Sequence, residues 1–130
     1  LLSNAIKFSP QGAEVTLKVG WTAAGGQYLS IRDNGPGIPE DEIPIVLQSF
    51  GRGSLAIKTA EQGTGLGLPI VKGLVEMHGG SLIIRSKLRE GTEVIATFPP
   101  QRVMDTLAPL ANESGPAMPQ PTLRRRRAAA

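Results

Sequence analysis

Residues 62–80 read QGTGLGLPIVKGLVEMHGG and say more about the fold and function of this chain than any other stretch. Three alternate glycines stand directly before an amphipathic helical pattern that ends on a glycine pair. Glycine lets a ligand approach the main chain, and the first N–H groups of the following helix lack intrahelical partners. Those donors and the helix dipole form an anion site that suits a polyphosphate. A flexible loop before a helix explains this stretch equally well, so the rest of the chain must decide.

Length and composition limit the possible classes of protein. The 130 residues suffice for one ordinary domain, and the absence of cysteine excludes disulfides and thiolate metal sites. No apolar run approaches the roughly 20 residues that cross a bilayer, and the N-terminus LLSNAIKF does not resemble a signal peptide. We therefore expect a cytoplasmic domain, whose parent protein can still be anchored to a membrane.

The net charge of +3 comes entirely from the C-terminal part of the chain. Residues 1–98 hold nine basic and nine acidic side chains, whereas residues 99–130 hold five and two. Six prolines, small residues and the run Arg124 to Arg127 in that second part bury too little apolar surface to offset chain entropy. We expect a domain at 1–98 and a disordered tail at 99–130, in which a solvated arginine run is favoured over binding to nucleic acid or anionic lipid.

Hydrophobic periodicity predicts a mixture of helices and strands. Alternation indicates strands at 14–19, 28–33, 81–86 and 92–98, the first with Val15, Leu17 and Val19 on one side. Helical spacing indicates helices at 1–9, at 40–50 with a kink or late start at Pro44, and from the glycine motif to residue 78, with a mobile loop at 51–61. Adjacent strands favour antiparallel pairing, so we expect an α+β fold: a two-layer sandwich with a mixed, largely antiparallel sheet and helices on one face.

Asp33 ends the second predicted strand on the same face as Leu29 and Ile31. If those two side chains point into the core, Asp33 carries a carboxylate to its edge. The chain has no P-loop sequence, and its glycine motif does not complete a Rossmann fingerprint. Two common nucleotide-binding folds are therefore disfavoured.

Four segments, in the right order, resemble the motifs of the catalytic and ATP-binding domain of sensor histidine kinases. LLSNAIKFSP resembles the N box, RDNGPGIPED the G1 box, LQSFGRGS the F box, and GTGLGLPIVKGLVEMHGG the G2 box. The resemblance spans residues 1 to about 98 and extends to the GHKL superfamily, which includes gyrase B, Hsp90 and MutL. It implies the Bergerat ATP-binding fold, ATP and Mg²⁺ as ligands, and transfer of the γ-phosphoryl group to a histidine on a separate domain.

The resemblance also implies roles for single residues. Asp33 resembles the family's adenine-reading carboxylate, and an ionised acid does accept from an exocyclic amine. A plain strand-end aspartate that caps the following turn is the alternative. Asn4 resembles the asparagine that ligates Mg²⁺, to which an amide oxygen is suited. Lys7 resembles a phosphate-contacting lysine, the alternative for both being a solvated helix face.

Further positions follow from the same resemblance. Phe50 resembles the F-box aromatic, although core packing explains it equally well. Arg52 begins the family's ATP lid and would meet the γ-phosphate, unless it is an ordinary exposed arginine. Thr92 would hold the adenine pocket through water. The other expected nucleotide contacts wrap the base or give main-chain N–H groups to the phosphates: Gly35, Gly37, Ile38, Gly63, Thr64, Gly65, Leu66, Gly67 and Leu68.

The chain also departs from the family pattern. The N box has an earlier asparagine one helical turn before Asn4, a position that the sequence does not include. The single histidine, His78, is expected to cap or pack at a helix end, so the phosphoacceptor histidine domain and the response regulator must be separate partners. Two alternatives stay open. One is a folded but catalytically inert nucleotide-binding or interaction fragment. The other is a GHKL-type ATPase or serine kinase, which would require a glutamate in place of that earlier asparagine.

Overall fold

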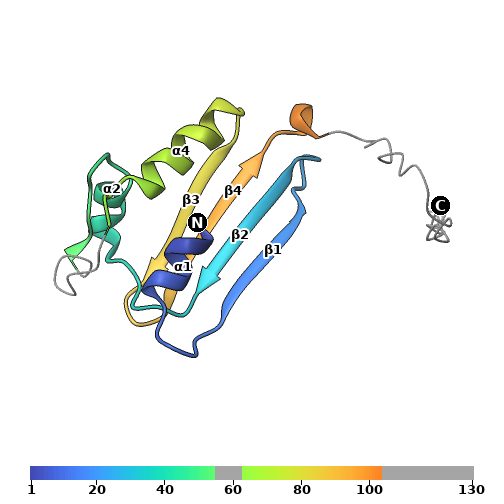
Figure 1. Ribbon diagram of the computed structural model, residues 1–130. Helices are drawn as coiled ribbons and strands as arrows, with labels where there is room; N and C mark the ends of the chain where they lie inside the picture. Colours follow the sequence, from blue (N-terminus) through green and yellow to red (C-terminus); the bar gives the residue numbers. More distant parts are fainter. Residues whose placement is uncertain (55–62, 104–130) are drawn as a thin grey trace, which may run out of the picture.

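The computed structural model describes residues 1–54 and 63–103 as four strands with helices on one side of them (Figure 1). The strands follow the order β1-β2-β4-β3 across the sheet. The elements are α1 (Leu2–Phe8), β1 (Val15–Trp21), β2 (Gln27–Asp33), the 3₁₀ turn η1 (Glu40–Glu42), α2 (Ile43–Val46), α4 (Gly67–Met77), β3 (Ser81–Lys87), β4 (Gly91–Phe98) and the 3₁₀ turn η2 (Pro100–Arg102).

Two antiparallel hairpins make the sheet. The first joins β1 to β2 through a turn in which the Thr22 N–H donates to the Gly26 carbonyl at 2.8 Å. The second joins β3 to β4, and β4 then lies between β3 and β2, antiparallel to both. The predicted α+β fold is confirmed. All three pairings of the described strands are antiparallel, where a mixed but largely antiparallel sheet was predicted.

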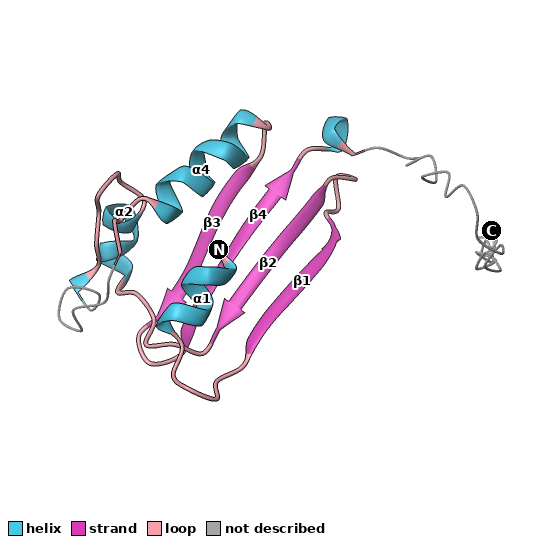
Figure 2. Ribbon diagram, in the orientation of Figure 1, coloured by secondary structure: helices cyan, strands magenta, loops and turns pink. Residues whose placement is uncertain are grey.

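Helices α1 and α4 lie on the same face of the sheet (Figure 2). Helix α1 packs on β2, and α4 packs on β3 and β4. Strand register puts Leu29, Ile31 and Asp33 on this face, as the alternation predicted. The core beneath the helices is built from small and branched side chains, namely Ala5, Ile31, Val46, Val75, Val94 and Ala96.

The apolar side of β1 departs from the prediction of a half-buried strand. Leu17 and Val19 are 55% and 70% exposed, and Trp21 beyond them is 64% exposed. Their partners across the sheet are residues of β2 on the helix-covered face. The described helices pack mainly on the other three strands, so the outer strand keeps its apolar side chains in contact with solvent.

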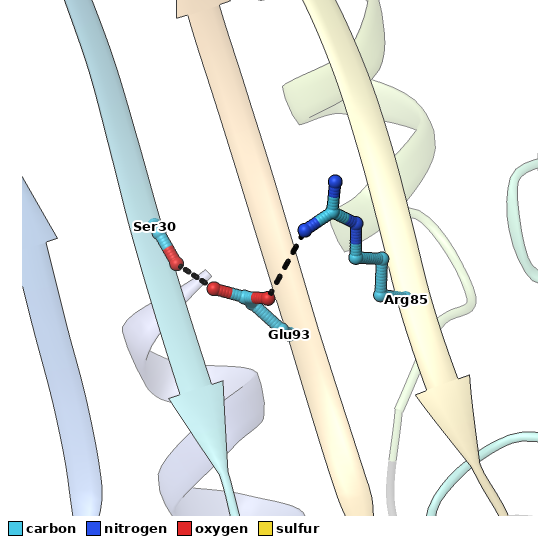
Figure 3. Close-up of polar contacts among 3 residues, drawn as sticks. All are labelled: Ser30, Arg85 and Glu93. Atoms are coloured by element: carbon cyan, nitrogen blue, oxygen red, sulfur yellow. Dashed lines mark hydrogen bonds and ion pairs between the residues drawn. The ribbon is translucent and has the colours of Figure 1, made fainter. Parts of the chain in front are cut away.

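The opposite face of the sheet carries polar side chains. Ser30 on β2 donates a hydrogen bond to Glu93 on β4 at 2.6 Å, and Glu93 lies 4.0 Å from Arg85 on β3 (Figure 3). The Arg85 side chain is 70% exposed, so this ion pair contributes little to stability. The buried Ser30 hydroxyl nevertheless has a hydrogen-bond partner, so the cluster connects neighbouring strands of the sheet.

The predicted helix at 40–50 is wrong in its second half. A 3₁₀ turn leads into α2, which ends at Val46, and Pro44 stands in its first turn, in agreement with the late start. Proline is tolerated there because its missing N–H would be unpaired anyway. Leu47 and Phe50 follow the last helical residue, and Phe50 has a positive φ of 64°, which no helix interior accepts.

Helix α4 ends as the glycine pair predicted. Gly79 has a φ of 72°, its N–H donates to the Glu76 carbonyl at 2.9 Å, and the Gly80 N–H donates to the Val75 carbonyl at 2.9 Å. This is the Schellman arrangement that stops a helix. Most of the predicted mobile loop at 51–61 and of the tail at 99–130 lies outside the described residues. Within the described ranges, no helix has the length and hydropathy needed to cross a membrane.

Candidate functional site

A cavity of about 290 Å³ lies where α1, the end of β2, α2 and the start of α4 meet. Its walls include side chains or main-chain atoms from all four segments that carry the sequence motifs. Among the predicted site residues, the lining includes Asn4, Lys7, Asp33, Gly37, Ile38, Arg52, Gly63, Thr64, Gly65, Gly67, Leu68 and Thr92. The fold therefore brings together residues that are up to 88 positions apart in the chain, from Asn4 to Thr92.

Asp33 stands at the inner end of this cavity and is only 8% exposed. Its Oδ1 accepts hydrogen bonds from the Gly35 N–H at 2.9 Å and from the Thr92 N–H at 3.3 Å. Its Oδ2 accepts none from the residues that the structure describes. Two main-chain donors thus fix the carboxylate, and one oxygen keeps its capacity to accept from a ligand.

The loop after Asp33 lies close against the β3–β4 turn. A Cβ atom on Gly37, where φ is 75°, would stand 2.1 Å from the Lys87 carbonyl oxygen, so no larger residue fits. The Arg89 N–H donates to the Pro36 carbonyl at 2.8 Å, which ties the two segments together. Gly35 is not among the residues that line the cavity, and its N–H donates to the Asp33 Oδ1.

Ser86 on β3 also supports this end of the cavity, and the sequence analysis missed it. Its Oγ accepts a hydrogen bond from the Ile38 N–H at 2.7 Å and lies 2.8 Å from the Thr92 Oγ1. Strand alternation puts Ser86 on the same face as Thr92 and Asp33, which is the signal that could have identified it.

The other end of the cavity is built from α1 and the glycine motif. A Cβ atom on Gly67 would stand 3.6 Å from Nδ2 and 3.7 Å from Oδ1 of Asn4, so the Asn4 amide lies over the start of α4. A Cβ atom on Gly63 would stand 2.7 Å from the Lys7 ammonium nitrogen. The missing side chains of the two glycines therefore leave room for a neutral oxygen ligand and a cation.

Glu42 lines the cavity and was also missed by the sequence analysis. Its Oε2 accepts a hydrogen bond from the Ser54 N–H at 2.8 Å, just beyond Arg52 in the chain. The carboxylate thus ties η1 to the start of the predicted lid, whose residues 55–61 lie outside the described part. Apolar lining residues complete the walls, and these, too, were not predicted: Phe8, Ile31, Val46 and Val94.

The sequence profile of the family described as "Histidine kinase-, DNA gyrase B-, and HSP90-like ATPase" matches residues 1–102. The chain belongs to this family. The predicted resemblance is confirmed, and the match ends close to the predicted domain boundary at 98, which stays a prediction in itself.

Histidine kinases are among the proteins similar to this ATPase domain. The sensor histidine kinase YkoH of Bacillus subtilis is 42% identical over 101 residues, which make up 78% of this chain and 22% of YkoH. The circadian input-output histidine kinase CikA of Synechococcus elongatus is 37% identical over 109 residues, or 84% of this chain and 14% of CikA. The chain thus spans less than a quarter of the length of either relative.

Solved structures lead to the same family. The mycobacterial sensor histidine kinase MprB superposes with a TM-score of 0.65 at 36% identity, over 75% of this chain and 64% of the MprB chain. Full-length ShkA in complex with AMPPNP superposes with a TM-score of 0.64 at 29% identity, over 75% of this chain and 19% of ShkA. The prediction of an ATP-binding module of the sensor histidine kinase type is therefore confirmed.

Phe50 is the predicted site residue whose position differs most from the prediction. Its side chain is 73% exposed, so the alternative of core packing is wrong, and it is not among the residues that line the cavity. Its main-chain N–H donates to the Gly65 carbonyl at 3.1 Å, so this position holds the glycine motif through the backbone. Leu66, the residue before α4, does not line the cavity either.

His78 behaves as the sequence analysis expected. Its Nδ1 lies 2.7 Å from the Leu74 carbonyl oxygen, and the edge of its ring meets Phe98 at a centroid distance of 6.4 Å. The histidine therefore caps the C-terminal end of α4 and packs locally. Within residues 1–54 and 63–103, no three His, Cys, Asp or Glu side chains gather into a metal-binding cluster.

Proposed function

We propose that this domain binds one ATP with Mg²⁺ in the cavity, and that its parent protein transfers the γ-phosphoryl group to a histidine of a separate helical domain. The observation that carries the proposal is the carboxylate of Asp33, which is buried on the cavity wall with one oxygen held by main-chain donors and the other available. An ionised acceptor in this position suits the exocyclic amine of adenine. The AMPPNP complex of ShkA, a structural relative, supports a nucleotide in this fold.

The phosphates would then lie toward α1 and the glycine motif. Lys7 and Arg52 line this end and supply positive charge, and the main chain of residues 63–68 supplies N–H donors where α4 begins. Asn4 is the residue that would hold Mg²⁺, since its neutral amide oxygen suits a hard cation whose other ligands are phosphate and water. When bound, the ion neutralises charge on the phosphate oxygens.

Phosphoryl transfer by such a domain rests on position and charge. The chain's own residues orient the nucleotide through Asp33 and stabilise the charge of the phosphates through Lys7 and Arg52. His78, with its Nδ1 on a main-chain carbonyl at the far end of α4, is not proposed as the acceptor. The proposed partners are a phosphoacceptor histidine domain of the parent kinase and, downstream, a response regulator. We propose a cytoplasmic location for this part of the protein and no nucleic-acid partner.

Calorimetric titration of the complete chain with ATP, with Mg²⁺ and with excess EDTA, tests nucleotide and metal binding together. We expect one site for MgATP and weaker binding in EDTA. Asn4→Ala should reduce the gain from Mg²⁺ about threefold or more, because it removes an oxygen ligand. Ser3→Ala, an exposed change on the same helix, should leave that gain unchanged. A folded chain that gives no heat with MgATP would leave only the inert-fragment interpretation.

Phosphoryl transfer needs an acceptor, which a relative can provide. In a chimera, residues 1–102 would replace the matching segment of YkoH, and labelled ATP would report on autophosphorylation. We expect an acid-labile, alkali-stable phosphoryl label that disappears with Asp33→Asn. A chimera that binds ATP but acquires no label, or acquires an acid-stable label, would contradict the histidine kinase assignment and favour an inert domain or a serine kinase, respectively.

A further inference from the structure

The hydroxyl group of Ser86 joins three segments at the inner end of the cavity. Ser86 lies on β3, one residue before the strand ends, and pairs with Thr92 across the hairpin. Its Oγ accepts from the Ile38 N–H at 2.7 Å, lies 2.8 Å from the Thr92 Oγ1, and donates to the Gly91 carbonyl at 3.1 Å. One side chain outside the four sequence motifs thus connects the loop after Asp33 to the strand that carries Thr92.

The Ser86–Thr92 contact taken alone permits either hydroxyl to donate. Counting protons gives the one arrangement in which all three contacts of the Ser86 Oγ are hydrogen bonds at once. A serine hydroxyl has one proton and two lone pairs. In that arrangement the Ser86 proton goes to the Gly91 carbonyl and one lone pair accepts from the Ile38 N–H, so the remaining lone pair accepts the proton of the Thr92 hydroxyl. Thr92 then has no proton to offer and presents only lone pairs to the cavity that it lines.

This arrangement of protons affects which ligand groups the cavity wall favours. Asp33 and Thr92 are paired neighbours on β2 and β4, and the Thr92 N–H already donates to the Asp33 Oδ1. With the Thr92 proton committed to Ser86, both side chains offer acceptors. A group with N–H donors is favoured beside two acceptors, and a carbonyl oxygen is disfavoured.

We propose that Ser86 is a positioning residue of the nucleotide site. It fixes the main chain of Ile38 on the cavity wall and keeps the Thr92 hydroxyl group an acceptor. Both effects increase the preference for a base with an amino group. The proposal rests on the proposed function, because it assumes a nucleotide in the cavity. Ser86 acts through its neighbours and need not touch the ligand.

The same hairpin provides a matched control. Ser81 begins β3, and its Oγ lies 2.7 Å from the Thr97 Oγ1, so it forms the same cross-strand Ser–Thr pair at the opposite end of the strand. This second pair is exposed, and neither of its residues lines the cavity. Ser86→Ala and Ser81→Ala therefore remove equal groups from one hairpin, and only the first touches the proposed mechanism.

Amide hydrogen exchange in the nucleotide-free chain tests the link to Ile38. The Ile38 amide should exchange about tenfold faster in Ser86→Ala than in the unmodified chain, and at an unchanged rate in Ser81→Ala. In the unmodified chain, it should also exchange more slowly than the amide of Gly37, for which no acceptor is found among the described residues. Equal rates for these two amides, or no acceleration in a folded Ser86→Ala chain, would overturn the proposal.

Nucleotide selectivity tests the link to Thr92. Inosine triphosphate has a carbonyl in place of the 6-amino group of ATP and an N1–H donor in place of its N1 acceptor. The ratio of the dissociation constant of inosine triphosphate to that of ATP therefore reports on the hydrogen-bonding groups of the cavity wall. Ser86→Ala should lower this ratio about fivefold, while the affinity for tripolyphosphate stays unchanged. A general loosening of the domain would instead lower the affinity for tripolyphosphate as well. A ratio equal to that of Ser81→Ala would overturn the proposal. If the unmodified chain binds neither nucleotide, the proposed function fails, and the exchange rates still decide whether Ser86 holds this loop.

Discussion

The two ends of the cavity are built in different ways. At the end around Asp33, hydrogen bonds between strands and their loops hold the Asp33 Oδ1, the Ile38 N–H and the hydroxyl groups of Ser86 and Thr92. At the end around Lys7, a long side chain and the Asn4 amide lie over glycines of a segment far away in the sequence. The first end is a fixed surface, and the second is made of side chains that can adjust.

This difference separates recognition of the base from binding of the phosphates. A rigid carboxylate can distinguish an amine from a carbonyl, because selection by hydrogen bonds depends on direction as well as distance. Charged groups attract phosphates over a longer range and tolerate small displacements. Changes at the Asp33 end should therefore alter selectivity for the base, and also stability where they break the hydrogen bonds or the close packing of this end. Changes at the Lys7 end should alter affinity for phosphates alone.

Gly37→Ala should have the largest effect on stability, because it disrupts the close packing at the Asp33 end of the cavity. Its Cβ would stand 2.1 Å from the Lys87 carbonyl oxygen at a φ of 75°. We expect the free energy of unfolding to fall by about 2–4 kcal/mol, as measured by urea denaturation. Gly73→Ala, in a position on α4 with nothing within 4 Å of the added Cβ, should instead raise it by about 0.5–1 kcal/mol. Equal effects of the two changes would contradict this account of the loop.

Asp33→Asn should separate folding from recognition. Asparagine keeps an oxygen for the Gly35 and Thr92 N–H groups, but it replaces the available carboxylate oxygen by a donor. We expect ATP to bind about tenfold more weakly or worse, since a hydrogen bond to a charged group contributes roughly 1.5–3 kcal/mol. Calorimetry measures the affinity, and Asp41→Asn, an exposed acid on η1, is the control. Undiminished affinity in Asp33→Asn would show that the carboxylate does not contact the base.

Lys7→Ala should affect only the adjustable end. The lysine nitrogen stands beside Gly63, so its removal takes one positive charge from the proposed phosphate site. ATP should bind about fivefold more weakly, and adenosine should bind as before, when both are measured by competition with a fluorescent nucleotide. Lys18→Ala, an exposed lysine on β1, provides the control for net charge. A parallel loss of adenosine affinity would mean that the two ends are not independent.

Phe50→Ala should have the smallest effect of the series. The side chain is 73% exposed and does not line the cavity, while the main-chain bond to Gly65 survives the change. We expect ATP affinity to change less than about twofold and the unfolding free energy by less than about 0.5 kcal/mol. A loss comparable to that of Asp33→Asn would place the aromatic ring against the nucleotide in the bound state.

The sequence predicted the parts of this fold that depend on local pattern. Alternation placed Asp33 on the face of Ile31, and the glycine pair placed the end of α4, because period and chirality act within a few residues. Ser86 and Glu42 were missed because their roles depend on segments 48 and 12 residues away, which no local pattern reports. The exposed side of β1 was mispredicted for a related reason, since alternation shows which side chains share a face but not whether a helix covers it.

The most direct test of the central claim, that a fixed carboxylate reads the amino group of the base, compares MgATP with Mg²⁺ inosine triphosphate on the unmodified chain by calorimetry. The account predicts one site that binds ATP at least about tenfold more tightly, because the carbonyl of the second base would face the Asp33 carboxylate. Equal affinity of the folded chain for the two nucleotides would contradict it.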